Sequence, residues 1–515
     1  MARPLHGLVG ANLVALLLDV VPMMRTATRW KLALVMGIVV LSSLPYLVGW
    51  LNANEQRAYV GRQPTSVADT GPYYSNIEQV RQGRILVENQ FTSEPQEPSL
   101  FHPLWILLGW IAALAHLSTP VVFHLSRLVA VVAFILIIDR GLQTFMPDWR
   151  RRYTTLAILA TSSGLGWVIA LWTGTKLPAI ETPVDIWVSE ANTFLSLGHS
   201  SLFICSQLIL AAVYWAAYQL TQGRRTMLVG PLLLLIGSIH PYDLVPAAIV
   251  VGVWVGGWLM FSRSDRRQWT HIITILASWW VWTLPLIPYY LYLVLRQPAM
   301  VGWLRQNVDI TPFWPAVVLG YGLLWPLAWY GAKTWWSEHR TAALFAICWI
   351  SVTLLLAYVP GLSFQRRLLN GVHIPIAVLA SVGLFRVVER VVIQRWRTVV
   401  IALIAVALAI TNLKLLETAV TKTLQPALAD YPVYERRDVL AGIAWLRDHS
   451  RFGEPVLSQV WNGNTIAGLA ARTVVLGHGH QTIQPLDRWH DWDTVVNPQS
   501  TDQQRREVID RLGVV

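Results

Sequence analysis

Asp69 is an acidic residue whose type and surroundings suit proton transfer. It precedes Gly71-Pro72, where the chain is expected to turn, and the aromatic pair Tyr73-Tyr74. A carboxylate in this position can accept a proton from an attacking hydroxyl, or can help to hold a divalent metal. Aspartate before a proline-containing first turn is also a common N-cap, here of a helix predicted over residues 73–82. The sequence leaves both interpretations open.

Four further residues of catalytic type lie in two later polar segments. Asp185 and Glu190 lie in the first, and His240 and Asp243 flank a Pro-Tyr corner in the second. The two acids can face the same cavity as Asp69, or can be solvated loop residues. His240 and Asp243 can contribute to a site, or can hydrogen-bond across their own turn with no wider role.

Three arginines occupy places where a cation needs a reason. Arg366 and Arg367 are adjacent where a loop enters the apolar block 368–385. They can clamp a phosphate or diphosphate, or can be interfacial side chains that reach lipid phosphate. Arg127 lies about 12 Å into the block 119–138 at 1.5 Å per residue. A cation at that depth predicts a functional site shared with His124, or a structural hydrogen bond to another helix.

Metal and nucleotide signals are weak. The two histidines of Gly477-His478-Gly479-His480 can chelate a metal, but an isolated His-x-His is common. The sequence contains no zinc-ligand spacing and no phosphate-binding glycine loop, which argues against an ATP-driven pump. Cys205 and Cys348 both fall in apolar blocks, so they predict no disulfide framework.

The elements that position these residues are predicted to be membrane spans. Hydrophobic residues make up 54% of the 515 residues and charged residues only 13%, and a soluble chain with so little charge would not cover its own core. The stretch 227–260 adds two spans if it breaks at His240-Pro241, which gives about eleven in all. The apolar blocks are 31–50, 119–138, 153–172, 201–221, 271–292, 311–330, 341–360, 368–385 and 399–416.

The basic residues predict the orientation of the chain. The formal charge of +11 does not indicate nucleic-acid binding, because the basic residues are confined to short loops between apolar blocks. Placing these loops in the cytoplasm satisfies the positive-inside rule, with a cytoplasmic N-terminus and a tail from about residue 418 outside the cell membrane. The residues are Arg25, Arg29, Lys31, Arg140, Arg150, Arg151, Arg152, Arg224, Arg225, Arg263, Arg266, Arg267, Lys333, Arg340, Arg386, Arg390, Arg395 and Arg397.

This orientation places the long polar loops 52–118 and 173–200 outside the cytoplasm. Residues 1–417 then form the transmembrane domain. The apolar segment 103–117 is then interpreted as an interfacial or re-entrant helix, with a short true span as the alternative. Residues 7–24 are apolar but contain Asn12, Asp19 and Pro22 and lack a signal-peptide cleavage site. An interfacial helix and a start-site artefact are both open for them.

The segment 418–515 is predicted to be a small extracytoplasmic α/β module. Residues 439–449 and 502–512 have helical spacing, and 455–459 and 473–476 are typical of short strands. Another strand is expected to begin at Gly513-Val514-Val515, so we expect the tail to continue beyond this sequence.

Several of these features together resemble the GT-C superfamily of membrane glycosyltransferases, especially the branch of protein O-mannosyltransferases and lipid A aminoarabinose transferases. The similar features are Asp69 with Tyr73-Tyr74 in the first outward loop, His102-Pro103 at the next apolar element, Arg127, Arg366-Arg367 before Asn370-Gly371-Val372-His373-Ile374-Pro375, Trp445-Leu446-Arg447, and Gly477-His478. These motifs are short, and the resemblance covers most of the chain as architecture.

The resemblance implies inverting transfer of a hexose or pentose from a polyprenyl-phosphate carrier to an extracytoplasmic lipid, glycan or protein. It implies that Asp69 is the base and that Arg366 and Arg367 stabilise the departing phosphate. No second acidic residue adjoins Asp69, which puts a metal site of the family type in doubt, and the tail lacks the WWDYG element of oligosaccharyltransferases.

Competing functions are a polytopic lipid or sugar transporter or flippase, and a scaffold with a degenerate site. Inverted repeats with matching helix breaks would favour the transporter, and the sequence shows none. The sequence does not determine which sugar or acceptor is used, the metal dependence or the oligomeric state.

Overall fold

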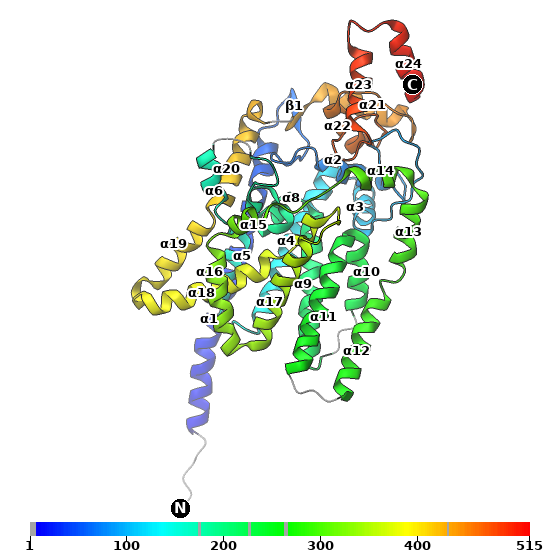
Figure 1. Ribbon diagram of the computed structural model, residues 1–515. Coiled ribbons are helices and arrows are strands. Elements are labelled where there is room, and N and C mark those ends of the chain that lie inside the picture. Colours follow the sequence, from blue (N-terminus) through cyan, green and yellow to red (C-terminus); the bar gives the residue numbers. More distant parts are fainter. Residues whose placement is uncertain (1–6, 174–176, 225–227, 262–265, 430–431, 515) are drawn as a thin grey trace, which may run out of the picture.

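The computed structural model describes residues 7–173, 177–224, 228–261, 266–429 and 432–514, and it is predominantly helical (Figure 1). The helices of the first half are α1 (Gly7–Leu51), α2 (Thr70–Arg81), α3 (Pro103–Leu114), α4 (Thr119–Leu142), α5 (Trp149–Thr161), α6 (Gly166–Thr173), α7 (Val184–Trp187), α8 (Thr193–His199), α9 (Ser201–Thr221), α10 (Val229–Ile239) and α11 (Leu244–Phe261). Those of the second half are α12 (Arg266–Val281), α13 (Leu286–Arg296), α14 (Pro298–Gln306), α15 (Trp314–Tyr321), α16 (Leu324–Glu338), α17 (Arg340–Ala357), α18 (His373–Val391), α19 (Arg397–Leu408), α20 (Ile410–Leu424), α21 (Arg437–His449), α22 (Val460–Ala470), α23 (Pro485–Val496) and α24 (Asp502–Leu512). The short 3-10 helices are η1 (Ser189–Ala191), η2 (Pro241–Asp243), η3 (Gln365–Leu369), η4 (Gln394–Trp396) and η5 (Pro426–Leu428), and the strands are β1 (Arg57–Tyr59) and β2 (Tyr434–Arg436).

Seven helical segments of the described chain are long and apolar enough to cross a membrane. The segment Gln394–Leu408 and the helix Ile410–Leu424 meet at a bend of 55° and make an eighth if they form one broken span. The protein is therefore a multi-pass helical membrane protein. The seven segments are Thr26–Leu51, Thr119–Leu142, Ser201–Thr221, Pro241–Phe261, Trp269–Arg296, Arg340–Ala357 and Gln365–Val391.

The predicted count of about eleven spans is not confirmed, because several apolar blocks are divided into shorter helices. The block 153–172 is split between α5 and α6, where Asp185 Oδ2 accepts the backbone N–H groups of Gly164 (2.9 Å) and Gly166 (3.2 Å) in place of a helical ladder. The block 311–330 is split between α15 and α16 at Gly322, whose φ of 43° is left-handed. The stretch 227–260 breaks at Pro241 as predicted, but α10 has only 11 residues.

Residues 7–24 and the segment 103–117, which the sequence left open, are both largely helical. Residues 7–24 continue the first span without interruption in α1, which projects from the helical body toward the N-terminus (Figure 1). Helix α3 has 12 residues and is about 18 Å long, which is shorter than the ~30 Å hydrocarbon core. Its length agrees with an interfacial or re-entrant helix.

Helix α18 is the buried axis of the helical body. All of the apolar window of Gln365–Val391 lies inside the protein. The helix crosses α16 closely, because a Cβ atom on Gly331 would lie 1.9 Å from the Leu379 carbonyl oxygen, and one on Gly383 would lie 2.0 Å from that of Leu327. Small residues at such a crossing let two backbones approach. Helix α17 packs on η3, which carries Arg366 and Arg367 just before α18.

Ion pairs join helix ends at the side predicted to be cytoplasmic. Asp139, near the end of α4, accepts Lys31 Nζ and Arg152 Nε, each at 2.6 Å, and the pair with Arg152 is buried. Arg151 pairs with Glu389 at 2.5 Å. Three of the basic residues expected on one face therefore lie close together in space.

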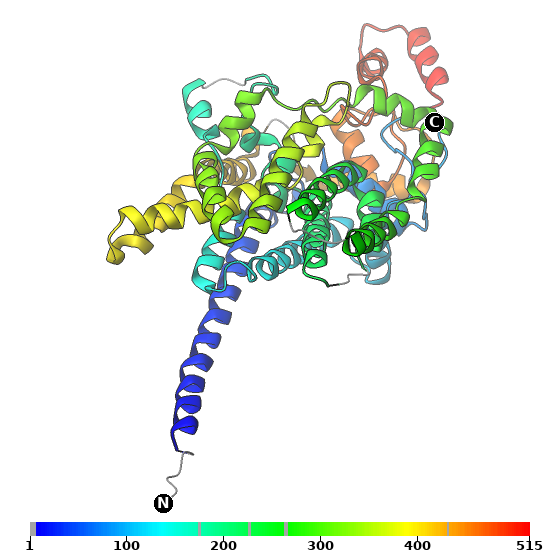
Figure 2. The same ribbon diagram turned by 60° about the horizontal axis from the view of Figure 1, so that its bottom comes forward.

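The C-terminal tail is bound to the first outward loop. Strand β1 of that loop pairs antiparallel with β2 of the tail, with Ala58 opposite Glu435. Arg62 forms a buried ion pair with Glu435 at 2.6 Å. Figures 1 and 2 show the tail helices at the end of the body away from the N-terminus.

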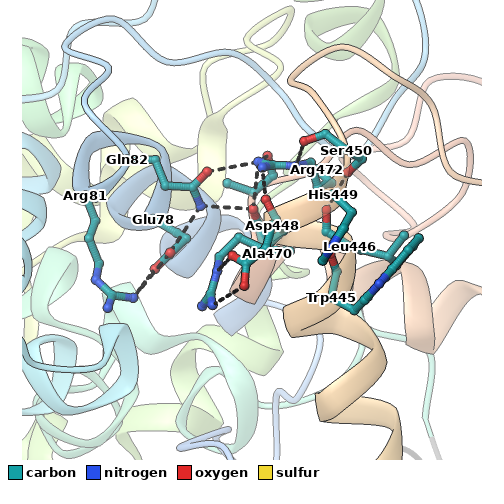
Figure 3. A network of polar contacts seen from close by, with 12 residues as sticks. Glu78, Arg81, Gln82, Trp445, Leu446, Asp448, His449, Ser450, Ala470 and Arg472 are labelled. Atoms are coloured by element: carbon teal, nitrogen blue, oxygen red, sulfur yellow. Dashed lines mark hydrogen bonds and ion pairs between the residues drawn. The ribbon is translucent and has the colours of Figure 1, made fainter.

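Tail helix α22 packs directly on α2. A Cβ atom on Gly71 would lie 2.6 Å from Asn464 Oδ1, so the contact tolerates only glycine there. At the other end of α2, Arg472 donates to Gln82 Oε1 (2.9 Å) and to the carbonyl oxygens of Ala470 (3.1 Å) and Ser450 (3.1 Å), as Figure 3 shows.

The prediction of an α/β tail is not confirmed. Helices α21 and α24 match two of the predicted elements, and α22 and α23 are additional helices. The predicted strands 455–459 and 473–476 meet only at an isolated parallel bridge between Val456 and Val474. Within the described residues, the tail contributes one strand, β2, and it belongs to a sheet with the outward loop.

Candidate active site

Asp69 occupies the N-cap position of α2 but does not cap it. Its side chain makes no capping hydrogen bond and instead accepts the hydroxyl of Ser66. The side chain is 45% exposed. The interpretation of Asp69 as a helix cap is therefore not confirmed, because its carboxylate accepts the Ser66 hydroxyl and no backbone N–H group of α2.

Two histidines from distant parts of the chain face this carboxylate. His199 Nε2, at the end of α8, lies 4.0 Å from Oδ2, and His478 Nε2, in the tail loop after α22, lies 3.6 Å from Oδ1. The loop of His478 is fixed from two sides, because Asn89 donates to the Gln481 carbonyl at 2.8 Å and Gln306 donates to that of Thr482 at 2.6 Å. The sequence placed His478 in a weak metal motif and among the features of the family resemblance, but did not predict that it faces Asp69.

The hydrogen bonds of His478 determine its tautomer. Nδ1 accepts the backbone N–H groups of His480 (3.0 Å) and Gln481 (3.2 Å), so this nitrogen carries no proton. Nε2 then carries the proton, and it has no other partner among the described residues. The N–H group of Nε2 is therefore available to the Asp69 carboxylate.

The electrostatics keep Asp69 ionised. Burial by the surrounding protein raises the pKa of Asp69, but the interactions with His478, His199 and Ser66 outweigh it and hold this pKa well below its usual range. Burial lowers the pKa of His199, and the carboxylates of Asp69 and Glu190 oppose that effect. Asp69 is thus an anion at any physiological pH.

Tyr73 connects Asp69 electrostatically to the arginines. Burial raises the pKa of the Tyr73 hydroxyl, the carboxylates of Asp69 and Glu190 raise it further, and Arg367 lowers it. Glu190 is 3% exposed in η1, and its carbonyl accepts the Gly371 N–H at 3.1 Å. Asp69, Glu190 and Arg367 therefore all act electrostatically on the Tyr73 hydroxyl, and a shared site for these residues stays a prediction.

One carboxylate holds both arginines. Asp309 Oδ1 accepts Arg366 Nη2 at 2.5 Å, and Asp309 Oδ2 accepts Arg367 Nε at 2.7 Å. The guanidinium of Arg366 lies over the Trp187 ring at 4.8 Å, and that of Arg367 lies over the Tyr242 ring at 5.1 Å. Two guanidinium groups against one carboxylate leave an excess positive charge, held in a fixed orientation. Sequence reasoning missed Asp309, which follows a helix in a loop without any motif.

Asp185, His240 and Asp243 make structural contacts away from Asp69. Asp185 is fully buried at the α5–α6 break described above. Asp243 accepts Asn370 Nδ2 (2.9 Å) and the Ser206 hydroxyl inside the helical body, and its Oδ2 lies 3.0 Å from His240 Nδ1. The two ends of the turn are therefore close, although neither ring nitrogen of His240 makes a hydrogen bond within the described residues.

Arg127 and Tyr74 also bind their own protein. Arg127 donates to the carbonyl oxygens of Leu197 (2.8 Å) and Ser42 (3.2 Å) and to Ser43 Oγ (3.0 Å). Tyr74 donates to the Gly61 carbonyl at 3.1 Å, which His124 Nε2 also contacts at 2.8 Å. These contacts join α1, α4, α8 and the outward loop, and a substrate-binding role for these residues stays a prediction.

A cavity of about 360 Å³ lies beside the Asp69 centre. Its walls come from α2, residues 87–102, α10, α13 and α14, and they include Pro72, His102 and Tyr242. His102 caps α3 through the Trp105 N–H (3.4 Å) and also contacts the Ile239 carbonyl (3.1 Å). Because the Tyr242 ring lies under Arg367 and also lines the cavity, the cavity adjoins the arginine pair.

A divalent metal remains a hypothesis. In the part of the chain that the structure describes, no group of three or more His, Cys, Asp or Glu side chains is arranged to hold a metal ion. Asp69, His199 and His478 are the donors nearest to such a set, and His478 turns a protonated nitrogen to the carboxylate.

Comparison with solved structures identifies the fold. No protein-family model matches the sequence, and no curated protein matches it. The oligosaccharyltransferase of Archaeoglobus fulgidus, tethered to an acceptor peptide with an NVT sequon, matches with a TM-score of 0.52 and 12% identity over 94% of this chain and 68% of that one. The same archaeal enzyme, AglB, in complex with an inhibitory peptide and a dolichol-phosphate, matches with a TM-score of 0.50 and 13% identity over 94% and 68%. ArnT from Cupriavidus metallidurans in the apo state matches with a TM-score of 0.45 and 11% identity over 92% and 94%.

Proposed function

We propose that this chain, which shares the fold of GT-C membrane glycosyltransferases, transfers a hexosyl or pentosyl group from a polyprenyl-phosphate carrier to an extracytoplasmic acceptor with inversion. One observation carries the proposal: the carboxylate of Asp69 and the guanidinium of Arg367, which Asp309 orients, both act electrostatically on the hydroxyl of Tyr73. An acceptor hydroxyl and a departing phosphate need these two groups, one on each side of the sugar carbon. The described complex of AglB with a dolichol-phosphate is consistent with a lipid phosphate ligand.

The charges of Asp69 and the two arginines determine how the proposed sugar transfer would proceed. The acceptor oxygen forms a bond to the anomeric carbon as the bond from that carbon to the phosphate oxygen breaks, and the released electron pair stays on the phosphate. The hydroxyl proton goes to Asp69. A single displacement of this kind inverts the anomeric carbon.

The low pKa of Asp69 makes it a weak base toward a free alcohol. We infer that the proton moves late, when the new bond has made the hydroxyl acidic, as positioned general bases allow. His478 Nε2 faces Oδ1 at 3.6 Å and Oδ2 accepts the Ser66 hydroxyl, so both carboxylate oxygens are held in position to receive this proton.

Arg366 and Arg367 would stabilise the charge that accumulates on the leaving phosphate. A fixed cation gains interaction energy as negative charge develops, so it lowers the barrier more than it tightens ground-state binding. Asp309 prevents the two guanidinium groups from repelling each other and sets their direction.

The orientation belongs to the same proposal. We place the Lys31–Asp139–Arg152 end in the cytoplasm and the Asp69 centre and tail outside the cell membrane, because the basic residues gather at the former.

The experiment measures the accumulation and cleavage of the polyprenyl-phosphate-linked sugar that serves as the carrier. Cells that lack this chain are expected to accumulate a polyprenyl-phosphate-linked sugar, which mass spectrometry of the lipid extract would identify. Purified protein in nanodiscs should then release free polyprenyl phosphate from that lipid when acceptor is supplied. Movement of the intact carrier between leaflets without release of sugar would replace this proposal by the transporter alternative.

A further inference from the structure

The cavity beside Asp69 has a chemical character that the arginine centre does not share. Among its lining residues, Glu88 is the only one with a side chain charged at neutral pH. Arg84 at 2.6 Å and the Gln90 side chain at 3.0 Å already bind the Glu88 carboxylate. Burial lowers the pKa of His102 to about 3, so the imidazole that lines the cavity is neutral.

Most of the lining is apolar, and its polar part consists largely of carboxamides. A carboxamide both donates and accepts, as a sugar hydroxyl does, and an aromatic face suits the C–H face of a sugar ring. Phe91, Tyr242 and Trp303 provide the rings. The carboxamides are those of Asn76, Asn89, Gln90, Gln96, Gln297 and Gln481.

Two buried polar atoms of this lining have no partner in the described chain. Ser75 is 1% exposed, and neither its Oγ nor Trp303 Nε1 makes a hydrogen bond. Buried polar groups are usually paired, and a ligand in this cavity can supply the partners of these two atoms. The size of the cavity, about 360 Å³, is within the range of small-ligand pockets.

Helix α2 connects this lining to the reacting centre. Asp69, Pro72 and Ser75 are spaced by three residues, so they lie on one face of the helix. An acceptor held against Ser75 and Asn76 therefore extends toward Asp69. The phosphate of the donor belongs on the other side of Tyr242, against Arg367.

We propose that this cavity binds the acceptor, and that the acceptor is a neutral carbohydrate, free or as a glycolipid headgroup, and not an anionic glycan. The inference rests on the proposed transfer reaction and adds the acceptor class to it. An anionic acceptor would find no cation in the lining to offset its desolvation.

The test uses full-length protein in nanodiscs with the accumulated polyprenyl-phosphate-linked sugar, labelled in the sugar. Extracts of the same cells are divided into a neutral glycan fraction, an anionic glycan fraction and a peptide fraction, and each is offered as acceptor. Label should enter the neutral fraction at least tenfold faster than the other two. A neutral glycolipid and a free neutral glycan are then separated by solvent partition.

Two variants test whether the acceptor binds in this cavity. Asn76→Asp should raise the KM for the neutral fraction about tenfold or more, because it adds a charge without changing the size of the side chain. Trp303→Phe keeps a ring and removes the unpaired N–H, and should raise KM about fivefold. Asn462→Asp, on an exposed part of α22, is the matched control and should behave as the unsubstituted protein does.

Each outcome is decisive. Entry of label into the peptide or anionic fraction, or equal KM values for Asn76→Asp and Asn462→Asp, overturns the acceptor assignment while the transferase proposal stands. Failure of the unsubstituted protein to cleave the carrier with any fraction overturns the transferase proposal and this inference with it.

Discussion

The Nε2 atom of His478 lies 3.6 Å from Oδ1 of Asp69, although the two residues belong to the C-terminal tail and to the first outward loop. Helix α22 packs on α2 and thereby brings the tail to the carboxylate, and α14 binds the same tail loop through Gln306. The reacting centre is thus completed by a segment outside the helical body, and it is connected to a wall of the neighbouring cavity.

Replacement of Asp69 by asparagine separates catalysis from structure. Asp69→Asn keeps the size of the side chain and removes its charge, and the carboxylate makes no capping bond to lose. We expect a folded protein that binds the carrier but transfers sugar about 10²–10⁴-fold more slowly, the usual effect of a positioned base. Asp487→Asn, at an exposed first turn of α23, is the control. Full transfer by Asp69→Asn would contradict the role of Asp69 as the base.

His478 is expected to act by positioning Asp69. His478→Ala should slow transfer about 10–100-fold, the effect of losing a hydrogen bond to a charged group, whereas His478→Gln retains an N–H donor and should recover part of the rate. Loss of the interaction raises the pKa of Asp69 toward its usual value. The acid limb of the pH–rate profile should therefore move to higher pH in His478→Ala. An unshifted profile, or an equal loss in His480→Ala, would reduce His478 to a packing residue.

The arginine pair is expected to bind the phosphate of the carrier. Arg366→Ala and Arg367→Ala should each weaken polyprenyl-phosphate binding about tenfold or more, since each removes a charge-assisted interaction. Arg395→Ala, an exposed residue of η4, should leave the Kd unchanged. Titration of the purified variants with the lipid phosphate measures this, and equal affinities in all three would make the pair ordinary interfacial residues.

The raised pKa of Asp185 predicts that the stability of the folded protein depends on pH. Burial raises the pKa of Asp185 to about 6, against the hydrogen bonds from Thr411, Gly164 and Gly166. A folded-state pKa above the unfolded value stabilises the fold at low pH, and this contribution, about 3 kcal/mol at most, is lost as pH rises from about 4 to 6. Asp185→Asn should remove that dependence, which thermal unfolding in detergent at several pH values would detect. Parallel curves for both proteins would contradict the prediction.

Accessibility to a membrane-impermeant thiol reagent tests the orientation. Cysteines introduced at Gln143, Gly223 and Asp265 should resist labelling in intact cells, and cysteines at Ser93 and Gln484 should react, because the basic loops are predicted to be cytoplasmic. Asp265 lies outside the described residues. Labelling at Asp265 without labelling at Ser93 would invert the topology.

The sequence by itself determined the class of protein and many helix positions. Long apolar blocks require helices in a membrane, since lipid offers no partners to the backbone, and the helices Ser201–Thr221 and Asp502–Leu512 agree with the predicted ranges. Asp69, Glu190, Arg366 and Arg367 are candidates from the sequence because charges beside apolar blocks are costly unless they have a use, and their roles stay predictions.

Only the tertiary structure decided which charges meet. Asp185 and Asp309 are both loop aspartates in the sequence, yet Asp185 closes a helix break and Asp309 holds the two arginines. Arg127 was equally compatible with a site and with a structural bond until Leu197 and Ser42 were placed beside it. Periodicity reports the environment of a residue along its own helix, whereas the partner of a side chain depends on contacts between distant segments. For that reason His478 became a partner of Asp69 only once α22 was packed on α2.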